Sequence, residues 1–512
     1  MIGLFGIILS LALLIFFAYR GVNVIILAPL MALLATAFAG GLPMLATYTQ
    51  VFMPALGNYL ITYFPLFLLG ALFGKLMDDS GSARAIAYFI VEKLGDTKAI
   101  LAIVLACGIL TYGGVSLFVV AFAVFPIAAA LFREAGVPKR LIPATIALGS
   151  FTFTMTALPG TPQIQNAIPA PFFGTNAFAA PGLGIIAAIM MFGGGTAWLM
   201  YRAKKLTAAG ETYLPAEAPK GPGLLARVTG KGTDRDERGS TSTGTSGGTA
   251  TGTAPEGAGT ATATAATGEP VATDQSTLPR PSVLVAFLPI FVVIALNYVL
   301  VTWVFPAMDT DYLAGDAYGN TDIDTVGGIW AIVVALVVST LVVVAFNLNR
   351  FGDVKESVNT GTMGSFLPIF NTASEVGYGA VIASLPAFRT VRDSVLGISG
   401  NPVISLAVAV NVLAGITGSA SGGMSIALQT LGEQFRGLAD AQGISLELMH
   451  RVTVLAAGGF DALPHNGAVV TVLAICGLTH RQSYKDIFVV AVAIPVVALV
   501  TVITLGTLFG GF

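Results

Sequence analysis

The feature that most constrains this chain is a succession of apolar runs, each about 18 to 22 residues long. A helix rises 1.5 Å per residue, so a run of that length crosses the hydrocarbon core of a bilayer. Charged residues make up only 10% of the 512 residues, whereas a soluble domain carries roughly 25%. The sequence therefore predicts an all-α polytopic membrane protein and excludes an ordinary soluble domain.

Ten of the runs are predicted to be membrane spans. The first run is interpreted as a span and not as a signal peptide, because a signal peptide would require a basic region before it. Two further stretches, 99–132 and 402–435, carry a cluster of glycine and hydroxyl residues at their middle. Each is predicted to be a re-entrant hairpin of two half-depth helices. The predicted spans lie near 2–19, 22–40, 59–77, 141–158, 182–201, 283–305, 327–346, 363–386, 452–478 and 487–510.

Residues 206–280 change abruptly to Thr, Gly, Ala and Ser, a composition that buries too little apolar surface to offset its ordering entropy. They are predicted to be a disordered cytoplasmic linker. On its two sides, the hairpin tips and the segments 157–160 and 462–465 match at an offset of about 305 residues. The chain is therefore predicted to hold two repeats, 1–205 and 281–512, each with five spans and one hairpin. An odd number of crossings inverts the second repeat, which is the plan of many secondary transporters.

The distribution of basic residues predicts the orientation, because Lys and Arg concentrate in cytoplasmic loops. With both termini outside, all but four of the 25 basic residues lie inside. The exceptions are Arg389, Arg392, Arg436 and Arg451, and no arginine is expected within the apolar part of a span. In this orientation the two hairpins enter from opposite sides of the cytoplasmic membrane, and their tips converge near its midplane.

The tips and two proline-containing breaks, at 158–163 and 463–467, are the predicted binding site. Irregular backbone at membrane depth is tolerated only where it is buried in protein or lines a wet cavity. Neutral donors at these places suit the hydroxyl and carboxylate oxygens of a small organic anion, although back-bonding of each Ser or Thr to its own helix is the alternative. The candidate substrate-binding residues are Thr111, Gly113, Gly114, Ser116, Thr156, Pro159, Gly160, Thr161, Gln163, Thr417, Gly418, Ser419, Ser421, Gly422 and Asn466.

Titratable residues within the predicted spans are few, and such groups at membrane depth usually belong to ion or proton pathways. Asp461 lies one helical turn before His465, whose imidazole titrates near neutral pH. The two are predicted to share the coupling proton, and Glu375 is a further candidate. The alternative is that Asp461 caps the broken helix and that His465 is a satisfied polar residue.

Several other functions are not supported by the residues. The net charge of −2 gives no basic footprint for nucleic acid. The motifs of a serine nucleophile elbow and of a zinc metalloprotease are absent. The two cysteines, Cys107 and Cys476, lie in apolar runs and offer neither a disulfide framework nor a zinc site. No metal or other cofactor is expected, and the chain is not expected to be an enzyme.

Four motifs together resemble the gluconate:proton symporter family, the GntP-type permeases of the ion transporter superfamily. They are residues 63–70 (YFPLFLLG), 110–116 (LTYGGVS), 156–162 (TALPGTP) and 460–467 (FDALPHNG). The resemblance implies proton-driven uptake of a small hydroxylated monocarboxylate, such as gluconate or 3-hydroxybutyrate, by elevator-type movement in a homodimer. It covers nearly the whole chain except the linker and the loop 306–325.

The sequence leaves alternatives open. A citrate or dicarboxylate carrier of the same superfamily is one, and sodium coupling is another. However, neither hairpin has the Ser-Asn-Thr tip of related sodium-driven dicarboxylate carriers, which disfavours sodium. A passive anion channel is a third alternative, although a pore does not require inverted hairpins and broken spans.

Overall fold

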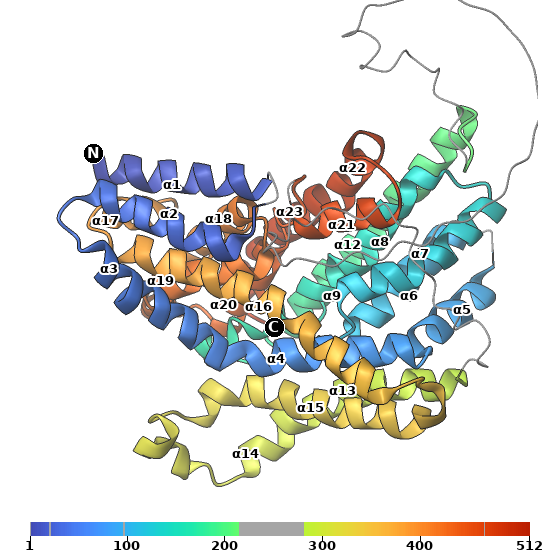
Figure 1. Cartoon of the computed structure of the whole chain (residues 1–512), viewed down its shortest axis with the longest axis horizontal. Helices are drawn as coiled ribbons and strands as arrows, with labels where there is room; N and C mark the ends of the chain where they lie inside the picture. Colours follow the sequence, from blue (N-terminus) through green and yellow to red (C-terminus); the bar gives the residue numbers. More distant parts are fainter. Residues whose placement is uncertain (1, 20–21, 96–97, 214–280, 465) are drawn as a thin grey trace, which may run out of the picture. The chain divides into compact units, whose positions relative to one another are not determined.

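The computed structural model describes residues 2–19, 22–95, 98–213, 281–464 and 466–512. Every regular element in these ranges is a helix (Figure 1). Before residue 214 the α-helices are α1 (Ile2–Tyr19), α2 (Val24–Ala39), α3 (Met44–Thr47), α4 (Met53–Asp79), α5 (Ser82–Leu94), α6 (Ala99–Tyr112), α7 (Leu117–Glu134), α8 (Ile142–Ser150), α9 (Phe153–Thr156), α10 (Ile164–Ala167), α11 (Ala170–Phe173) and α12 (Pro181–Ala208). A π-helical turn, Tyr48–Phe52, makes α3 and α4 continuous.

After residue 280 the helices follow a similar order. They are α13 (Val283–Val299), α14 (Phe305–Ala307), α15 (Ile323–Asn347), α16 (Val354–Ser384), α17 (Phe388–Leu396), α18 (Pro402–Thr417), α19 (Ala420–Gln442), α20 (Leu446–Ala457), α21 (Gly467–Ile475), α22 (His480–Phe488) and α23 (Ile494–Phe509). A π-helical segment, Val489–Ala493, joins α22 to α23. In both halves a long helix is followed by a short one, then by two helices that meet at a glycine-rich tip, and then by a broken helix.

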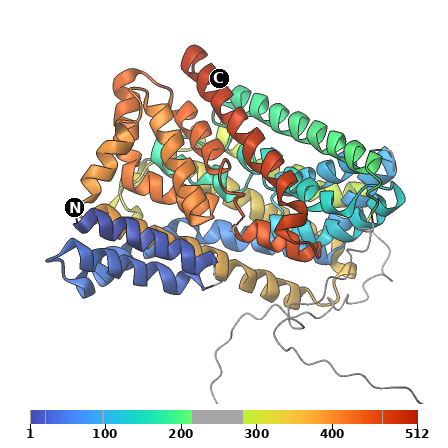
Figure 2. The ribbon, with the colours of Figure 1, turned by 90° about the horizontal axis from the view of Figure 1, so that it is seen from above.

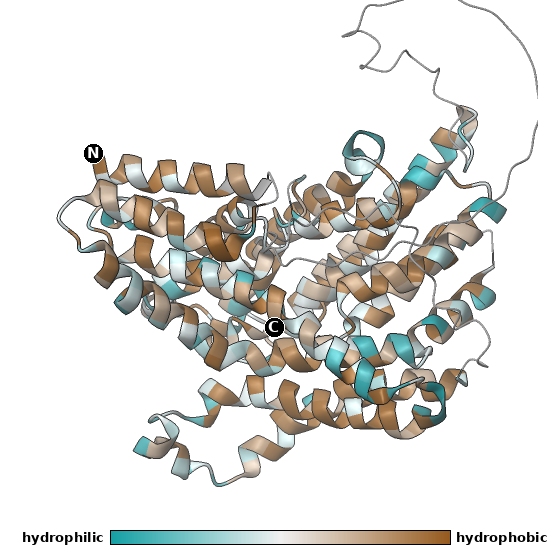
Figure 3. Ribbon diagram, viewed as in Figure 1, coloured by the Kyte–Doolittle hydropathy of each residue, from teal (hydrophilic) through white to brown (hydrophobic). Residues whose placement is uncertain are grey.

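Six helices in the described ranges are long and apolar enough to cross a membrane: Met44–Asp79, Leu117–Glu134, Pro181–Ala208, Val283–Ala307, Ile323–Arg350 and His480–Phe509. Figure 3 shows hydrophobic colour along most of α1, α13 and α15, whereas hydrophilic colour gathers on α22. These helices agree with the expected polytopic membrane protein. The chain is therefore a multi-pass membrane protein whose described part is all-helical.

Two pairs of helices at corresponding places in the halves pack antiparallel. Gly361, near the start of α16, approaches Leu72 near the end of α4, and Gly377, near the end of α16, faces Phe52 just before α4. In the second pair, the Leu183 amide at the start of α12 donates to the Phe512 carbonyl after α23 (3.2 Å). Figure 2 shows the C-terminus beside the start of α12. Near the other end of α12, Arg202 forms an ion pair with buried Asp486 of α22 (2.7 Å).

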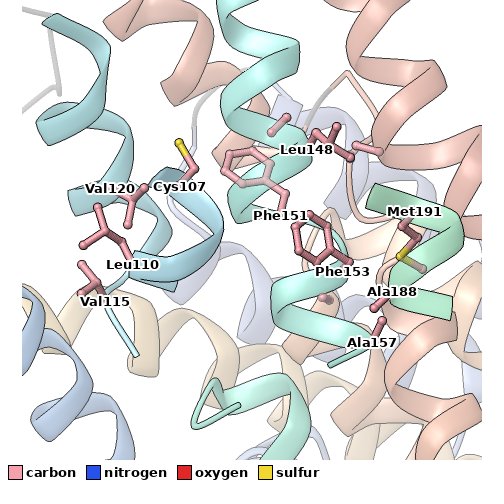
Figure 4. Close-up of a cluster of buried hydrophobic side chains, with 14 of the residues drawn as sticks. Cys107, Leu110, Val115, Val120, Leu148, Phe151, Phe153, Ala157, Ala188 and Met191 are labelled. Carbon is pink, nitrogen blue, oxygen red and sulfur yellow. The ribbon is translucent and has the colours of Figure 1, made fainter. Parts of the chain in front are cut away.

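Each tip is a sharp turn between two helices that pack against each other, α6 with α7 and α18 with α19. Gly114 takes φ +95° after α6, and Gly418 takes φ +65° after α18, conformations that glycine adopts without steric cost. Around the first hairpin, Cys107 and Leu110 of α6 belong to one buried cluster with Leu148, Phe153 and Met191 of α8, α9 and α12 (Figure 4). This packing fixes the first tip against the first break.

The structure differs from the sequence prediction in several lengths. The spans expected at 59–77 and 363–386 belong to longer helices, Met44–Asp79 and Val354–Ser384. The expected span 141–158 is interrupted between Ser150 and Phe153, before Pro159 and Pro162 of the predicted break, and the span 452–478 is interrupted from Gly458. The hairpin helices are longer than half-depth, and α7 is long enough to cross a membrane. Helix α12 runs to Ala208, three residues past the expected end of the first repeat at 205.

Candidate functional site

A cavity of about 600 Å³ lies where both tips and both breaks come together. Its wall is formed by residues from 114–119 of the first tip, 162–165 of the first break, 416–421 of the second tip and 466–468 of the second break, with one face each of α4 and α16. Small-molecule sites typically enclose about 300–1,000 Å³. The cavity is therefore of a size that suits a small organic substrate.

Helix α16 contributes a polar stripe to this cavity. Thr360, Ser365, Asn371, Thr372 and Glu375 all line it, at intervals that place them on one face of the helix. The fifteen-residue interval from Thr360 to Glu375 corresponds to about 22 Å of helix. The cavity therefore runs along a long part of α16 and reaches Glu375 at one end of the stripe.

The second tip is held by two side chains of the second break. Oδ1 of Asp461 accepts hydrogen bonds from the Ala420 amide at the start of α19 and from Nδ2 of Asn466, both at 2.8 Å. Nδ2 of Asn466 also donates to the Gly418 carbonyl (2.7 Å), and its Oδ1 accepts from the Ala468 amide, which caps α21. Asp461 therefore caps α19 of the hairpin rather than the broken helix on which it lies.

Glu375 lies against the same end of α19. Its side chain is 5% exposed, and its Oε2 atom is buried with no hydrogen-bond partner among the described residues. A Cβ added to Gly422 would overlap this Oε2 atom, so the glycine makes room for the carboxyl group. Ser419, the N-cap of α19, is also a polar neighbour of Glu375. Two carboxyl groups, on Asp461 and Glu375, thus lie at the start of one hairpin helix.

The first tip is built differently. Nε2 of Gln163, from the first break, donates to the Thr111 carbonyl at 2.7 Å and so ties the break to the tip. Ser116 is the N-cap of α7, but its side chain makes no capping hydrogen bond. Ser116, Leu117 and Phe118 all line the cavity. The first tip therefore presents an uncapped helix start to the cavity, whereas the start of α19 is already occupied by Ser419 and Asp461.

One lysine lies in the same cavity. Lys75 of α4 forms an ion pair with Asp79 one turn further along the helix (2.8 Å), and its side chain is 32% exposed. Among the described residues that line the cavity, Lys75 is the only one with a cationic side chain. Within the described ranges, no group of three or more His, Cys, Asp or Glu side chains is arranged to hold a metal ion.

Comparison with known proteins assigns this architecture to a family. Residues 2–209 match the model of the GntP family permease. The chain is 42% identical over 509 residues to the uncharacterized transporter YxjC of Bacillus subtilis, covering 98% of each chain. A 73-residue stretch is 45% identical to an uncharacterized transporter of Haemophilus influenzae, covering 14% of this chain and 17% of that protein. The chain belongs to the GntP permease family. It is a transporter and not an enzyme, and the family resemblance read from its motifs is confirmed.

The structure of this permease brings ten of the predicted site residues together. They come from both repeats and converge on one cavity although up to 352 positions separate them. The ten are Gly114, Ser116, Gln163, Thr417, Gly418, Ser419, Ser421, Asn466, Asp461 and Glu375.

The other described candidates lie behind the cavity wall. Gly113 packs against Ile290, Gly160 against Phe178, and Gly422 against Glu375. The Pro159 carbonyl oxygen accepts a hydrogen bond from the Tyr112 hydroxyl. The Thr156 hydroxyl donates to the Thr152 carbonyl one turn earlier, which is the back-bonding considered as the alternative for each Ser or Thr. Thr111 and Thr161 are fully buried, and their hydroxyl oxygens have no partner among the described residues. His465 lies outside the described residues.

Six polar cavity residues were not singled out as binding residues from the sequence: Lys75, Gln165, Thr360, Ser365, Asn371 and Thr372. In the sequence analysis, Lys75 served only as one of the basic residues that predict the orientation in the membrane. Asn371 and Thr372 lie three to four positions before Glu375, and this helical spacing is a signal that could have found them. Gln165 follows Gln163 by two residues, but nothing in the sequence indicates that the break turns both toward the cavity.

Arg451 was expected on the external side, just before the span 452–478. The structure instead includes it in α20, where it is fully buried. Its guanidinium donates to the carbonyls of Ala179 (2.6 Å), Ala157 (3.3 Å) and Ala177 (3.4 Å) and to Oδ1 of Asn166 (3.3 Å). A buried cation is tolerated here because Ala157, beside the first break, and Ala177 and Ala179, just before α12, turn their carbonyl oxygens toward one point. Arg451 thereby ties the second half to the first break.

Proposed function

We propose that this permease carries a small hydroxylated monocarboxylate, of the gluconate or 3-hydroxybutyrate class, together with a proton. The observation that carries the proposal is the cavity between the two tips, which combines neutral hydrogen-bonding groups with two carboxyl groups, Glu375 and Asp461. Neutral donors such as Ser421 and Asn371 suit the hydroxyl groups of such a substrate. The family resemblance implies the same class of substrate.

Electrostatics supports proton coupling. Two unit charges about 4 Å apart repel by about 4 kcal/mol at an effective dielectric constant of about 20. An organic anion that enters the cavity while Glu375 and Asp461 are both ionised meets repulsion of this kind, which falls with distance to about 1–2 kcal/mol at about 10 Å. A proton on one carboxyl group removes it, so the anion and the proton favour each other's binding. Asp461 and Glu375 are our candidates for the proton site, together with His465.

The packing of corresponding helices supports an inverted repeat. Helix α4 and α16, and α12 and α22–α23, occupy corresponding places at the offset of about 305 residues and run antiparallel. A second repeat of opposite orientation would produce this arrangement. We propose that both termini lie outside the cytoplasmic membrane, that residues 206–280 are a cytoplasmic linker, and that transport occurs by elevator-type movement in a homodimer.

Reconstituted permease in proteoliposomes tests the proposal. Uptake of radiolabelled gluconate, 3-hydroxybutyrate, citrate and succinate would be measured with an inward proton gradient, an inward sodium gradient, both or neither. We expect accumulation of a hydroxylated monocarboxylate that needs only the proton gradient and collapses on addition of a protonophore. Accumulation of citrate or succinate with sodium would identify the dicarboxylate alternative, and equilibration without accumulation would identify a channel.

A further inference from the structure

We propose that the substrate carboxylate binds at the first tip, between Lys75 and the uncapped start of α7, and that Lys75 thereby selects substrates with a single carboxylate. This inference rests on the proposed function, since it concerns where the same anion lies in the same cavity. It assigns a substrate-specifying role to a lysine that neither the motifs nor the family match identifies.

The position of Lys75 beside the first tip is fixed by helix packing. Gly74, the preceding residue of α4, lies against the tip so closely that a Cβ on it would be 3.4 Å from the Ser116 backbone nitrogen. Lys75, Ser116, Leu117 and Phe118 line one cavity. The ammonium group is held by Asp79 at 2.8 Å, so its position is set before any substrate arrives.

The two tips are not equally able to take an anion. At the second tip, the Ala420 amide donates to Asp461 and the Gly422 amide donates to the Ser419 side chain. At the first tip, the Ser116 side chain makes no capping hydrogen bond, and among the described residues no other side chain accepts from the first amides of α7. Helix α7 has 18 residues, and a helix of that length favours an anion at its N-terminus. The first tip therefore takes the substrate carboxylate, because a carboxylate of the protein already occupies the second.

A second observation points to a ligand at this place. Gln165 lines the same cavity and is 8% exposed, and its Oε1 atom is buried with no hydrogen-bond partner among the described residues. An unpartnered buried carbonyl oxygen costs free energy unless a donor meets it. A hydroxyl group of the substrate is such a donor, whereas a carboxylate is not. Lys75 and Gln165 thus match the two chemical groups of a hydroxylated carboxylic acid.

The same arrangement disfavours a second carboxylate. Lys75 is the sole cationic side chain among the described lining residues, and the other ionisable groups there, Glu375 and Asp461, are acids. The second carboxylate of a dicarboxylate would find no further cation and would be repelled by these acids. Charge complementarity of this kind sets specificity by penalising the wrong ligand.

Exchange of radiolabelled gluconate across proteoliposomes tests the inference, with gluconate and its uncharged amide, gluconamide, as competitors. The variants are Lys75→Met, Lys75→Arg and Asp79→Asn, with Lys204→Met as a matched control, because Lys204 is an exposed lysine of α12 outside the cavity. We expect Lys75→Met to raise KM for gluconate about tenfold or more with little change in kcat, because a charge-assisted hydrogen bond is lost. Lys75→Arg retains most of the affinity, and Asp79→Asn lowers KM because it removes the competing carboxylate.

Inhibition by gluconamide separates charge recognition from structural damage. We expect this neutral amide to inhibit the wild type and Lys75→Met equally. A KM for gluconate in Lys75→Met within twofold of wild type would overturn the inference, as would equal weakening of gluconate and gluconamide. If the wild type exchanges no hydroxylated monocarboxylate, the proposed function itself fails, so the two failures are distinguishable.

Discussion

Substitution of Asp461 can separate its proposed role in proton coupling from its structural role at the second hairpin tip. Its two hydrogen bonds, from the Ala420 amide and Nδ2 of Asn466, both end on Oδ1. The substitution Asp461→Asn retains an oxygen in that position and nearly the same volume, but it removes the negative charge and the ability to bind a proton. The variant therefore resembles the protonated acid permanently.

The cost to the second tip follows from these two bonds. A hydrogen bond to an ionised group contributes about 1.5–3 kcal/mol, and one between neutral groups contributes about 0.5–1.5 kcal/mol. Replacing two bonds of the first kind by two of the second costs about 2–3 kcal/mol of local stability. Asp461→Ala removes the acceptor as well, and the unpaired Ala420 amide adds about 1–3 kcal/mol.

Two transport assays on Asp461→Asn would give opposite results. Exchange of labelled gluconate between two equal pools needs no net proton movement, so we expect it to continue and to lose its dependence on pH. Accumulation driven by a proton gradient needs the acid to release its proton on each cycle, so we expect it to vanish.

The reasoning would be refuted if Asp461→Asn still accumulated gluconate to the wild-type ratio in a protonophore-sensitive manner. Asn466→Ala is the matched control, since it removes the hydrogen bond to Asp461 and the cap of α21 but keeps the carboxyl group. The variant also loses the hydrogen bond to the Gly418 carbonyl, so we expect it to be less stable by about 2–3 kcal/mol, as much as Asp461→Asn, and to remain coupled. Loss of coupling in both variants would assign the effect to tip structure instead of the proton.

Three further predictions follow from other contacts. Gly422→Ala places a Cβ where Oε2 of Glu375 lies, so proton-driven uptake should fall severalfold. Gly437→Ala, on the same helix but with open space around it, should leave uptake unchanged. Equal uptake by both variants would contradict a role for Glu375. Arg451→Met removes the guanidinium donor of the Ala157 and Ala179 carbonyls, whereas the Ala177 carbonyl keeps the Gly160 amide and Nδ2 of Asn166 as donors. At about 1–3 kcal/mol for each orphaned acceptor, the melting temperature of the detergent-solubilised permease should drop by several degrees. An unchanged melting temperature would show that the buried cation is not needed. Asp322 caps α15 by accepting from the Thr325 amide (2.7 Å), so Asp322→Ala should cost about 1 kcal/mol or less at this exposed position. The hydrogen bonds from Thr325 hold the pKa of Asp322 below its ordinary value, so this stabilisation is present above the ordinary carboxyl pKa and is lost as the pH falls through the lowered one; a thermal shift between wild type and variant that persists at low pH would contradict this.

The sequence predicted the class of fold and the elements of the site because both depend on local composition. Apolar runs of sufficient length predict membrane helices, and glycine or proline within such runs predicts where a helix stops. The tips at Gly114 and Gly418 and the break at Asn466 were therefore found from the sequence. These places recur in matched pairs, and ten of the residues predicted from them line one cavity.

Helix lengths were less predictable, because hydropathy marks only the apolar part of a helix. Polar turns such as those at the start of α16 continue the helix while lowering the hydropathy, so the span appeared to begin near 363 instead of at Val354. The early interruption at Thr152 has no proline or glycine of its own. It arises where α8 and α9 pack against the first hairpin, and sequence-local rules do not include that packing.

By itself, then, the sequence determined that the chain is a helical membrane protein, with four irregular segments able to form a binding site. Only the tertiary structure decided which side chains share the cavity and which support it from behind. It placed Lys75 beside the first tip, Asp461 on the start of α19, and Arg451 among the carbonyls of the first break. The physical reason is that membrane insertion depends on hydrophobicity summed over a run, whereas these contacts depend on antiparallel packing between residues hundreds of positions apart.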